Sequence, residues 1–492
     1  MAGKNRKEKF YIDIMNLNTE VTGSCILLVV KFPNETKREI LIDCGLFQEG
    51  RYEDRNKILP FEAKDIDYVI VTHNHVDHTG RLPLLVKEGY EGKIYMSNPT
   101  TYLIPFGLKD SARVINSNAK IIKKNKKRGH ISNRCYKNCT TIYDGDDVFA
   151  TLGLVVGHEY RKTYSLDNNI KVTFFENGHL PGAIIGLLQV SYPGYDDINV
   201  LFTGDYNNNN MFFDVPDLPD WVKRLPVTII QECTYGHEDS SKINYIFEEN
   251  IKKAISEERT IIVPVFSLGR SQELMYTIRK LQESKKLDVN IPTFYEGKLG
   301  MRYTDLYVKD KLGLNITDFF PRNFQPIYRG YDRVKVFSSS GPKIILTTSG
   351  MGSHGPAQEY LPMYLPNKNA LIHFTGYVAE GTLGRTLYET DKGDVVSIKG
   401  RQIKKEAEVK YTSEFSGHAR ADVLLKFLES FYQPKLILIN HGSEESQKKY
   451  SKLILDRLNP KDLCRLNGEY LFRINSYGLI KSFPTKFYCN LS

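Results

Sequence analysis

The chain has 492 residues, 41% of them hydrophobic and 25% charged, which is the composition of a soluble globular protein long enough for two or three domains. No apolar run reaches the roughly 18 residues of a membrane span, and no apolar stretch follows the basic start, so neither a span nor a secretory signal is expected. The net charge of +9 permits a polyanionic partner. The seven scattered cysteines argue against a disulfide framework and for a reducing, cytoplasmic setting.

The pattern along the chain changes from strands to an alternation of strands and helices. Short apolar or alternating segments predict strands over 10–17, 25–32, 39–45, 67–73 and 93–97, and again over 170–179, 184–192 and 199–206. Further on, helical patterns at 243–258 and 269–286 alternate with buried-looking strands at 260–266, 343–350 and 369–377. A helix over 422–431 and a strand over 435–442 follow. The middle section therefore has the rhythm of a parallel-sheet α/β domain.

A dense group of metal-ligand side chains follows the fourth predicted strand. In "THNHVDH", three histidines and an aspartate fall within six positions, as His73, His75, Asp77 and His78, although the chain has only 11 histidines. His73 and His75 alternate, so both can point to one side of an extended segment, and the next residues turn into a helix with Pro83 in its first turn. Imidazole nitrogen and carboxylate oxygen are both good zinc ligands, so the segment predicts a metal site rather than a polar turn.

Three more ligand-type side chains stand at the ends of predicted strands. They are His179 in "FFENGHLPGA", Asp205 in "VLFTGDYN" and His441 in "KLILINHG". Each alone has a plain explanation, since a histidine after a strand is usually packed or exposed and an aspartate after glycine is usually a turn residue. Together they repeat one pattern, in which an apolar strand delivers a ligand-type side chain to a sheet edge. That repetition favours a shared site.

At this point the motifs resemble a known family. "LIDCG", "THNHVDH", "NGHLPGA" and "FTGDY" are similar to the metallo-β-lactamase fold, and the rest resembles its β-CASP branch of nucleic-acid-processing nucleases. That second likeness runs through "QECTYG", "VPVFSLGRSQELMYTI", "TTSGMGSHGPAQEYL", "HFTGYVAEGTLGRTL", "FSGHA" and "NHG", so it covers nearly the whole chain. The resemblance implies an α/β protein: an αββα metallo-β-lactamase sandwich over 1–236 and 411–492, with an α/β β-CASP domain inserted over 237–410.

The resemblance also implies the site residues. One metal is held by His73, His75, His179 and a bridging Asp205, and a second by Asp77, His78, Asp205 and His441. Asp43 does not bind a metal itself, but its carboxylate fixes the orientation of a ligating histidine or of the bridging water. The ions are two Zn²⁺, with Mn²⁺ as an alternative because mixed nitrogen and oxygen sites accept other metals. Asp77, Glu232 and His418 are the implied catalytic residues. Within the family, DNA-directed branches tend to carry a small apolar residue at the last position, so His441 indicates RNA.

The mechanism expected from this set is hydrolysis of single-stranded RNA. A hydroxide held by two zinc ions about 3.5–4 Å apart attacks the phosphorus, and His418, oriented by Glu232, protonates the leaving oxygen as general acid. Two glycine-rich stretches offer backbone N–H groups to phosphates through Gly350, Gly352, Gly381 and Gly384. Ser416 either caps the following helix or contacts a phosphate.

Several alternatives stay open. A DNA nuclease of the same fold, a small-molecule hydrolase, and an RNA-binding subunit without catalysis each fit part of the pattern, and cutting can be internal or from the 5′ end. The basic run at 120–130 is expected to be an exposed loop or helix edge, solvated or contacting RNA. His130, Cys135 and Cys139 lack the fourth ligand of a structural zinc site. Strand-like residues from 470 onward can pair within the chain or form a homodimer. No membrane partner is expected.

Overall fold

The computed structural model divides the chain into two units. It describes residues 9–485 apart from 19, 49, 128–141, 310, 315, 317, 377, 379 and 380. Unit 1 consists of Met1–Ser240 and Gly417–Ser492, and unit 2 of Ser241–Ser416. The insertion predicted over 237–410 has nearly the same sequence bounds as unit 2. The assignment of these residues as a separate domain stays a prediction.

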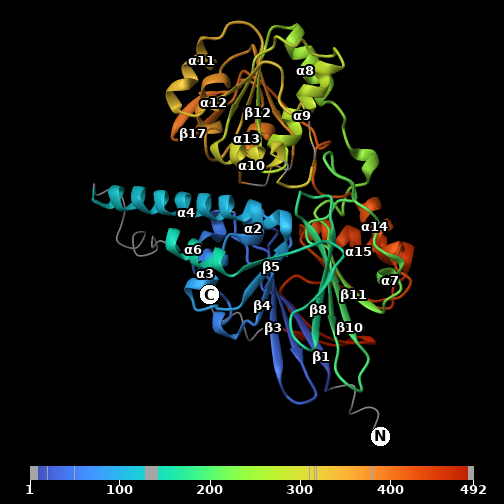
Figure 1. The fold of residues 1–492 in the computed structure, drawn as a ribbon. Coiled ribbons are helices and arrows are strands. Elements are labelled where there is room, and N and C mark those ends of the chain that lie inside the picture. Colours follow the sequence, from blue (N-terminus) through green and yellow to red (C-terminus); the bar gives the residue numbers. More distant parts are fainter. Residues whose placement is uncertain are drawn as a thin grey trace. The chain divides into compact units, whose positions relative to one another are not determined.

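Unit 1 is built on two sheets (Figure 1). The first has, in spatial order, β23 (Gly478–Pro484), β22 (Tyr470–Asn475), β1 (Tyr11–Asn16), β2 (Ile26–Lys31), β3 (Lys37–Ile42), β4 (Tyr68–Ile70), β5 (Lys93–Ser97) and β6 (Val155–His158). The second has β21 (Leu463–Arg465), β20 (Pro434–Asn440), β11 (Val227–Glu232), β10 (Ile198–Phe202), β9 (Ile184–Val190), β8 (Ile170–Glu176) and β7 (Thr163–Ser165). The C-terminal strand-like residues thus pair within the chain, β22 with β1 and β23.

The two sheets pack face to face with helices on their outer sides, which is the expected αββα sandwich. In β2, Leu28 and Val30 point into the core between the sheets, whereas Leu27 points into the core beneath the helices of the first sheet. Because successive side chains face opposite sides, a strand buried on both faces reads as a continuous apolar run. The outer helices are α2 (Val76–Thr79), α3 (Leu82–Lys87), α4 (Asn98–Lys127) and α6 (Gly145–Gly153) on the first sheet, and α7 (Asp220–Lys223), α14 (Ala421–Glu429) and α15 (Glu444–Leu458) on the second.

Strand direction in the second sheet brings several chain segments to one edge. β10, β11 and β20 are parallel neighbours, and β8 runs the same way because β9 is antiparallel to both β8 and β10. Their carboxyl ends therefore meet at the same edge of the sheet. His179, Asp205, Glu232 and His441 stand at or just after these ends.

Unit 2 is a parallel α/β domain, as the alternation of strands and helices predicts. Its six-stranded sheet has the order β14 (Phe324–Pro326), β13 (Thr293–Glu296), β15 (Lys343–Thr347), β12 (Thr260–Pro264), β16 (Ala370–Phe374) and β19 (Glu408–Tyr411). Its helices are α8 (Phe247–Ser256), α9 (Arg270–Glu283), α10 (Lys298–Val308), α11 (Arg333–Ser338), α12 (Ala357–Tyr364) and α13 (Leu383–Glu389), and a separate hairpin pairs β17 (Val395–Ile398) with β18 (Arg401–Lys404). All residues of β12, β15 and β16 are buried, which explains why their sequences are mostly apolar, with Lys343 and His373 among the exceptions.

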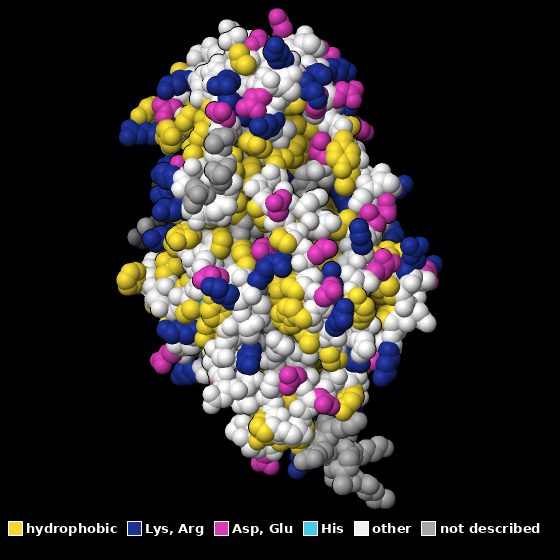
Figure 2. Space-filling model, turned by 45° about the vertical axis from the view of Figure 1, so that its right-hand side comes forward, with side chains coloured by type: hydrophobic (Ala, Val, Ile, Leu, Met, Phe, Trp, Pro, Cys, Tyr) yellow, Lys and Arg dark blue, Asp and Glu magenta, His cyan; other side chains and the backbone are white. Residues whose placement is uncertain are grey.

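The surface agrees with a modest charge bias. On the face drawn in Figure 2, basic and acidic side chains are interspersed, and histidine is scarcely visible. Among the described helices, none is both long and apolar enough to cross a bilayer. The run at 120–130 enters α4, which is helical to Lys127, but its side chains lie outside the described residues, as do His130, Cys135 and Cys139.

Candidate metal centre

Seven predicted ligand side chains and His418 come together in unit 1. They form three overlapping groups of ligand atoms that lie within 4.8 Å of one another: His73, His75, His179 and Asp205; Asp77, His78 and His441; Asp205, His418 and His441. These are the residues that the resemblance assigns to two ions, with Asp205 in more than one group. The chain therefore has a cluster of histidine and aspartate side chains able to hold divalent metal ions.

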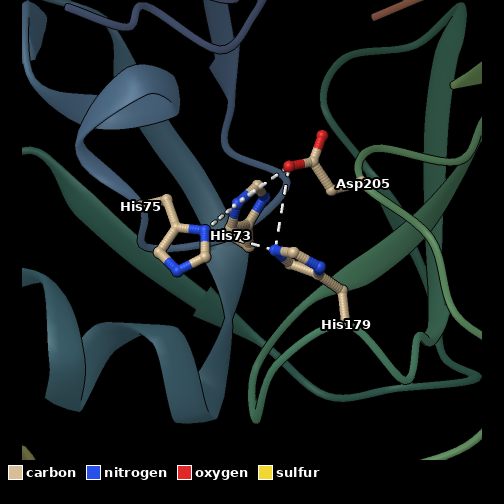
Figure 3. Close-up of side chains that lie close together, drawn as sticks. All are labelled: His73, His75, His179 and Asp205. Atoms are coloured by element: carbon tan, nitrogen blue, oxygen red, sulfur yellow. Dashed lines mark hydrogen bonds and ion pairs between the residues drawn. The ribbon is translucent and has the colours of Figure 1, made fainter. Parts of the chain in front are cut away.

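The first group is drawn in Figure 3. His75 Nδ1 lies 3.1 Å from His73 Nε2 and 3.2 Å from His179 Nε2. Asp205 Oδ2 lies 3.7 Å from the Nε2 atoms of both His73 and His179. Four ligand atoms thus converge on one point, as the ligands of a tetrahedral ion do.

The second group meets the other oxygen of the same carboxylate. Asp205 Oδ1 lies 3.4 Å from His78 Nε2 and 3.3 Å from His441 Nδ1. Asp77, in the first turn of α2, supplies the acidic oxygen of this group. One carboxylate therefore faces both groups, as a bridging ligand would.

Asp43 orients the segment that carries the histidines. Its carboxylate accepts hydrogen bonds from the Thr72 backbone N–H and the Thr72 hydroxyl, both at 2.8 Å, and from His78 Nδ1 at 2.7 Å. With Nδ1 donating, the Nε2 atom of His78 is left for a metal. Asp43 adopts a left-handed backbone conformation with φ 61°, an unusual geometry for a residue other than glycine.

Two glycines permit close approaches here. A side chain at Gly45 would place its Cβ 1.5 Å from the carbonyl oxygen of Asp77, so only glycine lets the Asp77 backbone pack there. Gly417 accepts a hydrogen bond on its carbonyl from His179 Nδ1 at 2.9 Å, which leaves His179 Nε2 for a metal. A Cβ at Gly417 would lie 2.9 Å from the same ring.

His418 and Glu232 form a pair beside the metal group. His418 Nδ1 lies 2.9 and 3.0 Å from the two carboxylate oxygens of Glu232, and His418 Nε2 faces Asp205 Oδ2 at 3.9 Å. Glu232 is buried at the end of β11 and also accepts hydrogen bonds from the backbone N–H groups of Tyr206 and Thr234. Its orientation is fixed, and it holds His418 with one ring nitrogen turned toward the cluster.

The pKa shifts within the cluster differ in direction between the first group and the histidines beside carboxylates. Burial, with the neighbouring imidazoles, keeps the pKa of His73 and His75 well below the usual value and lowers that of His179 to about 4, so these rings are neutral and can bind metal. Burial would lower the pKa of His78, but the carboxylates of Asp205 and Asp43 outweigh it and raise this pKa well above its usual value. Burial alone would also lower the pKa of His418, but the carboxylates of Glu232 and Asp205 outweigh it and raise this pKa to about 9. His418 therefore carries a proton at neutral pH.

The unpaired atoms test whether the residues fit metal ions. His78 Nε2, His441 Nε2 and Asp205 Oδ1 are buried and have no hydrogen-bond partner within the described part of the chain. Buried polar atoms are normally satisfied, so three orphaned atoms in one cluster indicate a ligand that they contact. Neutral imidazoles and carboxylates are the donor set of zinc and similar divalent ions. The residues fit.

Sequence reasoning missed the side chains that support these ligands. Thr234 places its hydroxyl 3.1 Å from His441 Nδ1. The Asn177 amide donates to the carbonyls of Thr203 and Asp205 and accepts from the N–H of His179, which ties two ligand loops together. Only the position of Asn177 directly after a strand hinted at this role.

The predicted substrate residues belong to unit 2, and their role stays a prediction. Ser416 does not cap the next helix: α14 begins at Ala421 with Arg420 at its N-cap, so that interpretation was wrong. The N–H groups of Gly352 and Gly384 already donate to the carbonyls of Ser349 and Met351. The remaining predicted positions, Gly350 and Gly381, lie in the loops that precede α12 and α13.

Family models match most of the chain. The metallo-beta-lactamase superfamily matches residues 18–224, the Beta-Casp domain residues 271–387, and the Zn-dependent metallo-hydrolase RNA specificity domain residues 402–461. The first match contains the histidine-rich segment, His179 and Asp205, and the third contains His418 and His441.

The curated relatives extend over most of this chain. It is 29% identical to the transcription termination factor FttA of Methanosarcina mazei over 87% of this chain and 66% of that protein. It is 28% identical to ribonuclease TTHA0252 of Thermus thermophilus, over 91% and 96%, and 26% identical to endoribonuclease YSH1 of Candida glabrata, over 92% and 58%. The chain thus spans about two thirds of the FttA relative and nearly all of the Thermus ribonuclease.

Proposed function

This chain belongs to the metallo-β-lactamase superfamily and carries a β-Casp domain, and on that premise we propose that it is a metal-dependent ribonuclease that hydrolyses phosphodiester bonds of single-stranded RNA. The observation that carries the proposal is the pairing of a complete ligand cluster with a protonated histidine at its edge. The matched RNA specificity domain and the relatives named as ribonucleases support RNA as the substrate.

The ligands divide between two ions. His73, His75, His179 and Asp205 would hold one, and Asp77, His78, His441 and Asp205 would hold the other, with zinc favoured by the donor types and manganese as an alternative. When bound, such ions act as Lewis acids that polarise a phosphoryl oxygen and make water a nucleophile near neutral pH. Asp43 keeps His78 in the tautomer with a free Nε2.

His418 supplies the proton for the leaving group. Its raised pKa of about 9 keeps the ring protonated at neutral pH, and its Nε2 atom faces the same carboxylate oxygen as the first ligand group. Glu232 acts through His418 as a positioning residue: it accepts the Nδ1 proton and so directs Nε2 toward the departing oxygen.

The test is a time course on a 5′-labelled single-stranded RNA, with DNA of the same sequence and the His418→Ala variant alongside. We expect the metal-loaded wild type to cut RNA in preference to DNA, and a chelator to stop the reaction. The variant is expected to keep its metal content and to cut much more slowly. The product ladder distinguishes internal cutting from 5′ trimming.

Two outcomes would contradict the proposal. A preference for DNA would identify a DNA nuclease of the same fold. Absence of cutting of either nucleic acid at full metal occupancy, with RNA binding retained, would favour an RNA-binding subunit without catalysis.

A further inference from the structure

Unit 2 has a polar cavity at the edge of its sheet where three neighbouring strands begin. Its volume is about 550 Å³, within the range of small-molecule sites. β12, β16 and β19 are parallel neighbours, and the residues just before each of them contribute to the wall. The charged lining residues are Arg259, Lys368, Lys392, Lys405, Glu257 and Glu408. The glycine-rich loops of the proposed RNA path follow the opposite, carboxyl ends of β15 and β16.

The acidic side chains of the wall are already neutralised. Arg259 Nη1 lies 2.6 Å from Glu408 and 3.3 Å from Glu257. Glu408 has a second partner in Lys410 at 3.2 Å, outside the lining. Three lysines are therefore left to set the charge of the cavity, and it favours an anion.

Arg259 is built into the wall. It is 8% exposed, and its Nη2 donates to the carbonyl of Ala370 at 2.7 Å, which fixes the guanidinium across the start of β16. Its Nε atom is buried without a hydrogen-bond partner among the described residues. An unsatisfied buried guanidinium N–H is costly, and an anionic oxygen bound in the cavity is the kind of acceptor that satisfies one.

The loops that carry the lysines are held by backbone hydrogen bonds. Lys405 is buried, and its ammonium donates to the carbonyls of Leu387 and Thr390. The turn after Lys392 is tied to Lys405, because the Gly393 N–H donates to the Lys405 carbonyl at 2.7 Å. The Asn369 carbonyl accepts from the Thr260 N–H at 3.1 Å and so positions Lys368 beside β12. These walls are preorganised, whereas the side chains of Lys368 and Lys392 are exposed and can reach a ligand.

The acidic groups around the rim do not reverse this charge. Glu406 is ion-paired with Lys404 at 2.6 Å. It also lies within electrostatic reach of Lys368 and Lys392, so these two lysines converge on one place beside this carboxylate. Asp391 and Asp394 act on Lys405, whose pKa is nevertheless lowered because burial outweighs them. A phosphate oxygen near Lys405 would stabilise its charged form.

We propose that this cavity binds phosphate groups, either of a free nucleotide or of the RNA backbone. Lysine ammonium groups bind phosphate as point charges and need no particular base. The remaining lining residues Asn369, Ala407 and Val409 include no aromatic ring on which a base could stack, so the site recognises phosphate rather than sequence. It is separate from the metal ligands, all of which belong to unit 1.

The test is calorimetric titration of the full-length, metal-loaded protein at low ionic strength with pyrophosphate, ADP and a single-stranded RNA. The variant Lys368→Glu/Lys392→Glu is expected to bind pyrophosphate roughly tenfold more weakly or worse, because two phosphate contacts become repulsive. The matched control is Lys285→Glu/Lys311→Glu, with the same charge change at exposed lysines of unit 2 outside the cavity. It is expected to bind like the wild type.

The arms of the experiment separate the sources of phosphate. Weaker binding of ADP by the cavity variant identifies a free nucleotide, and weaker binding of RNA alone identifies the RNA backbone. Equal pyrophosphate binding by wild type and cavity variant would overturn the proposal, as would an equal loss in the control. Phosphate bound at the metal cluster is unaffected by either variant, so this inference and the proposed ribonuclease function fail independently. Denaturant unfolding of both variants verifies that the exposed substitutions leave the fold intact.

Discussion

The metal cluster of unit 1 differs from two buried polar residues of unit 2, Glu296 and His373, in how the hydrogen-bonding atoms are used. Within the described cluster, His78 Nε2, His441 Nε2 and Asp205 Oδ1 have no hydrogen-bond partner. In unit 2, the equally buried Glu296 accepts hydrogen bonds from the Arg333 guanidinium at 2.8–3.2 Å and from the Tyr360 hydroxyl at 2.7 Å.

His373 of unit 2 makes the same contrast for histidine. It is fully buried, like His73, but its Nε2 accepts from the Asn250 amide at 3.0 Å and its Nδ1 lies 3.2 Å from the Phe374 carbonyl. Burial and polarity are therefore common to both regions. What marks the cluster of unit 1 as a place for a ligand is that three unused donor or acceptor atoms lie together among ligand-type side chains.

The largest expected effect is that of Asp205→Asn, which removes the charge shared by both ligand groups. Metal ions supply several kcal/mol of transition-state stabilisation, so kcat/KM for RNA is expected to fall by about a thousandfold or more. The metal-free variant is expected to lose some stability as well, because Asp205 Oδ1 faces His78 Nε2 at 3.4 Å and His441 Nδ1 at 3.3 Å. Added zinc raises the melting temperature of the wild type, but not that of the variant.

Asp13→Asn is the matched control for this prediction. Asp13 is also a buried aspartate of unit 1, but both of its oxygens accept from the Arg473 guanidinium, at 2.7 and 2.8 Å. Its loss is expected to lower stability and leave the zinc-induced shift in place. A zinc-induced shift of wild-type size in Asp205→Asn would contradict the assignment of Asp205.

The next effect is that of His418→Ala, which tests the proton donor without touching a predicted ligand. Loss of a general acid lowers the rate by roughly 10²- to 10⁴-fold. In the wild type, the donor is active while protonated, so the rate is expected to fall as the pH rises past about 9.

The measurement is the pH–rate profile together with metal content. His237→Gln, a nearby histidine bonded to Ser446 rather than to the cluster, serves as control. An unchanged alkaline limb in His418→Ala, or lost metal, would assign His418 a different role.

The clustering of these side chains was predictable because their signal is local. His73, His75, Asp77 and His78 lie in one contiguous motif, and the other ligands follow apolar strands whose parallel arrangement brings their ends together. Thr234 and Asn177 carry no such signal. Thr234 contacts His441, 207 positions away, and only the assembled sheet creates that contact.

The fold was predictable where strands are buried on both faces. The apolar runs at 25–32 and 260–266 contain β2 and β12. Boundaries were less accurate: the helix predicted over 243–258 begins only at Phe247, because the Asn244 side chain accepts from the Ser413 N–H and its carbonyl accepts from the Thr412 hydroxyl. Those contacts join residues distant in sequence, so local propensity cannot anticipate them.

Arg333→Met tests the other side of the comparison, the buried Glu296 of unit 2, whose carboxylate is hydrogen-bonded by the protein itself. It leaves the buried Glu296 with Tyr360 as its remaining partner, and breaking a buried ion pair is strongly destabilising. Because Arg333 is partly exposed, a loss of about 2–3 kcal/mol in the free energy of unfolding is expected, measured by denaturant titration. Zinc content should be unchanged. Arg329→Met, at an exposed arginine nearby, should cost little; equal losses in the two variants would argue against the Glu296 pair.

The smallest expected effect concerns His373 and pH. Burial lowers the pKa of His373 to about 4, below the ordinary value near 6.5 of an unfolded chain. The unfolded state therefore binds more protons between these values, and the stability that His373 contributes is complete above pH 6.5 and is lost as the pH falls toward 4. Between pH 7 and pH 5 the expected loss is about 2 kcal/mol of unfolding free energy.

The comparison of wild type with His373→Gln isolates this contribution, since other groups titrate alike in both proteins. The variant is expected to be less stable at pH 7 but to lose less stability on acidification, because glutamine has no proton to gain. His354→Gln, at an exposed histidine of the same unit, should keep the wild-type pH dependence. Equal pH slopes in all three proteins would mean that His373 is as easily protonated as a histidine in water. That result would contradict the burial that lowers the pKa of His373, as burial also lowers that of His73.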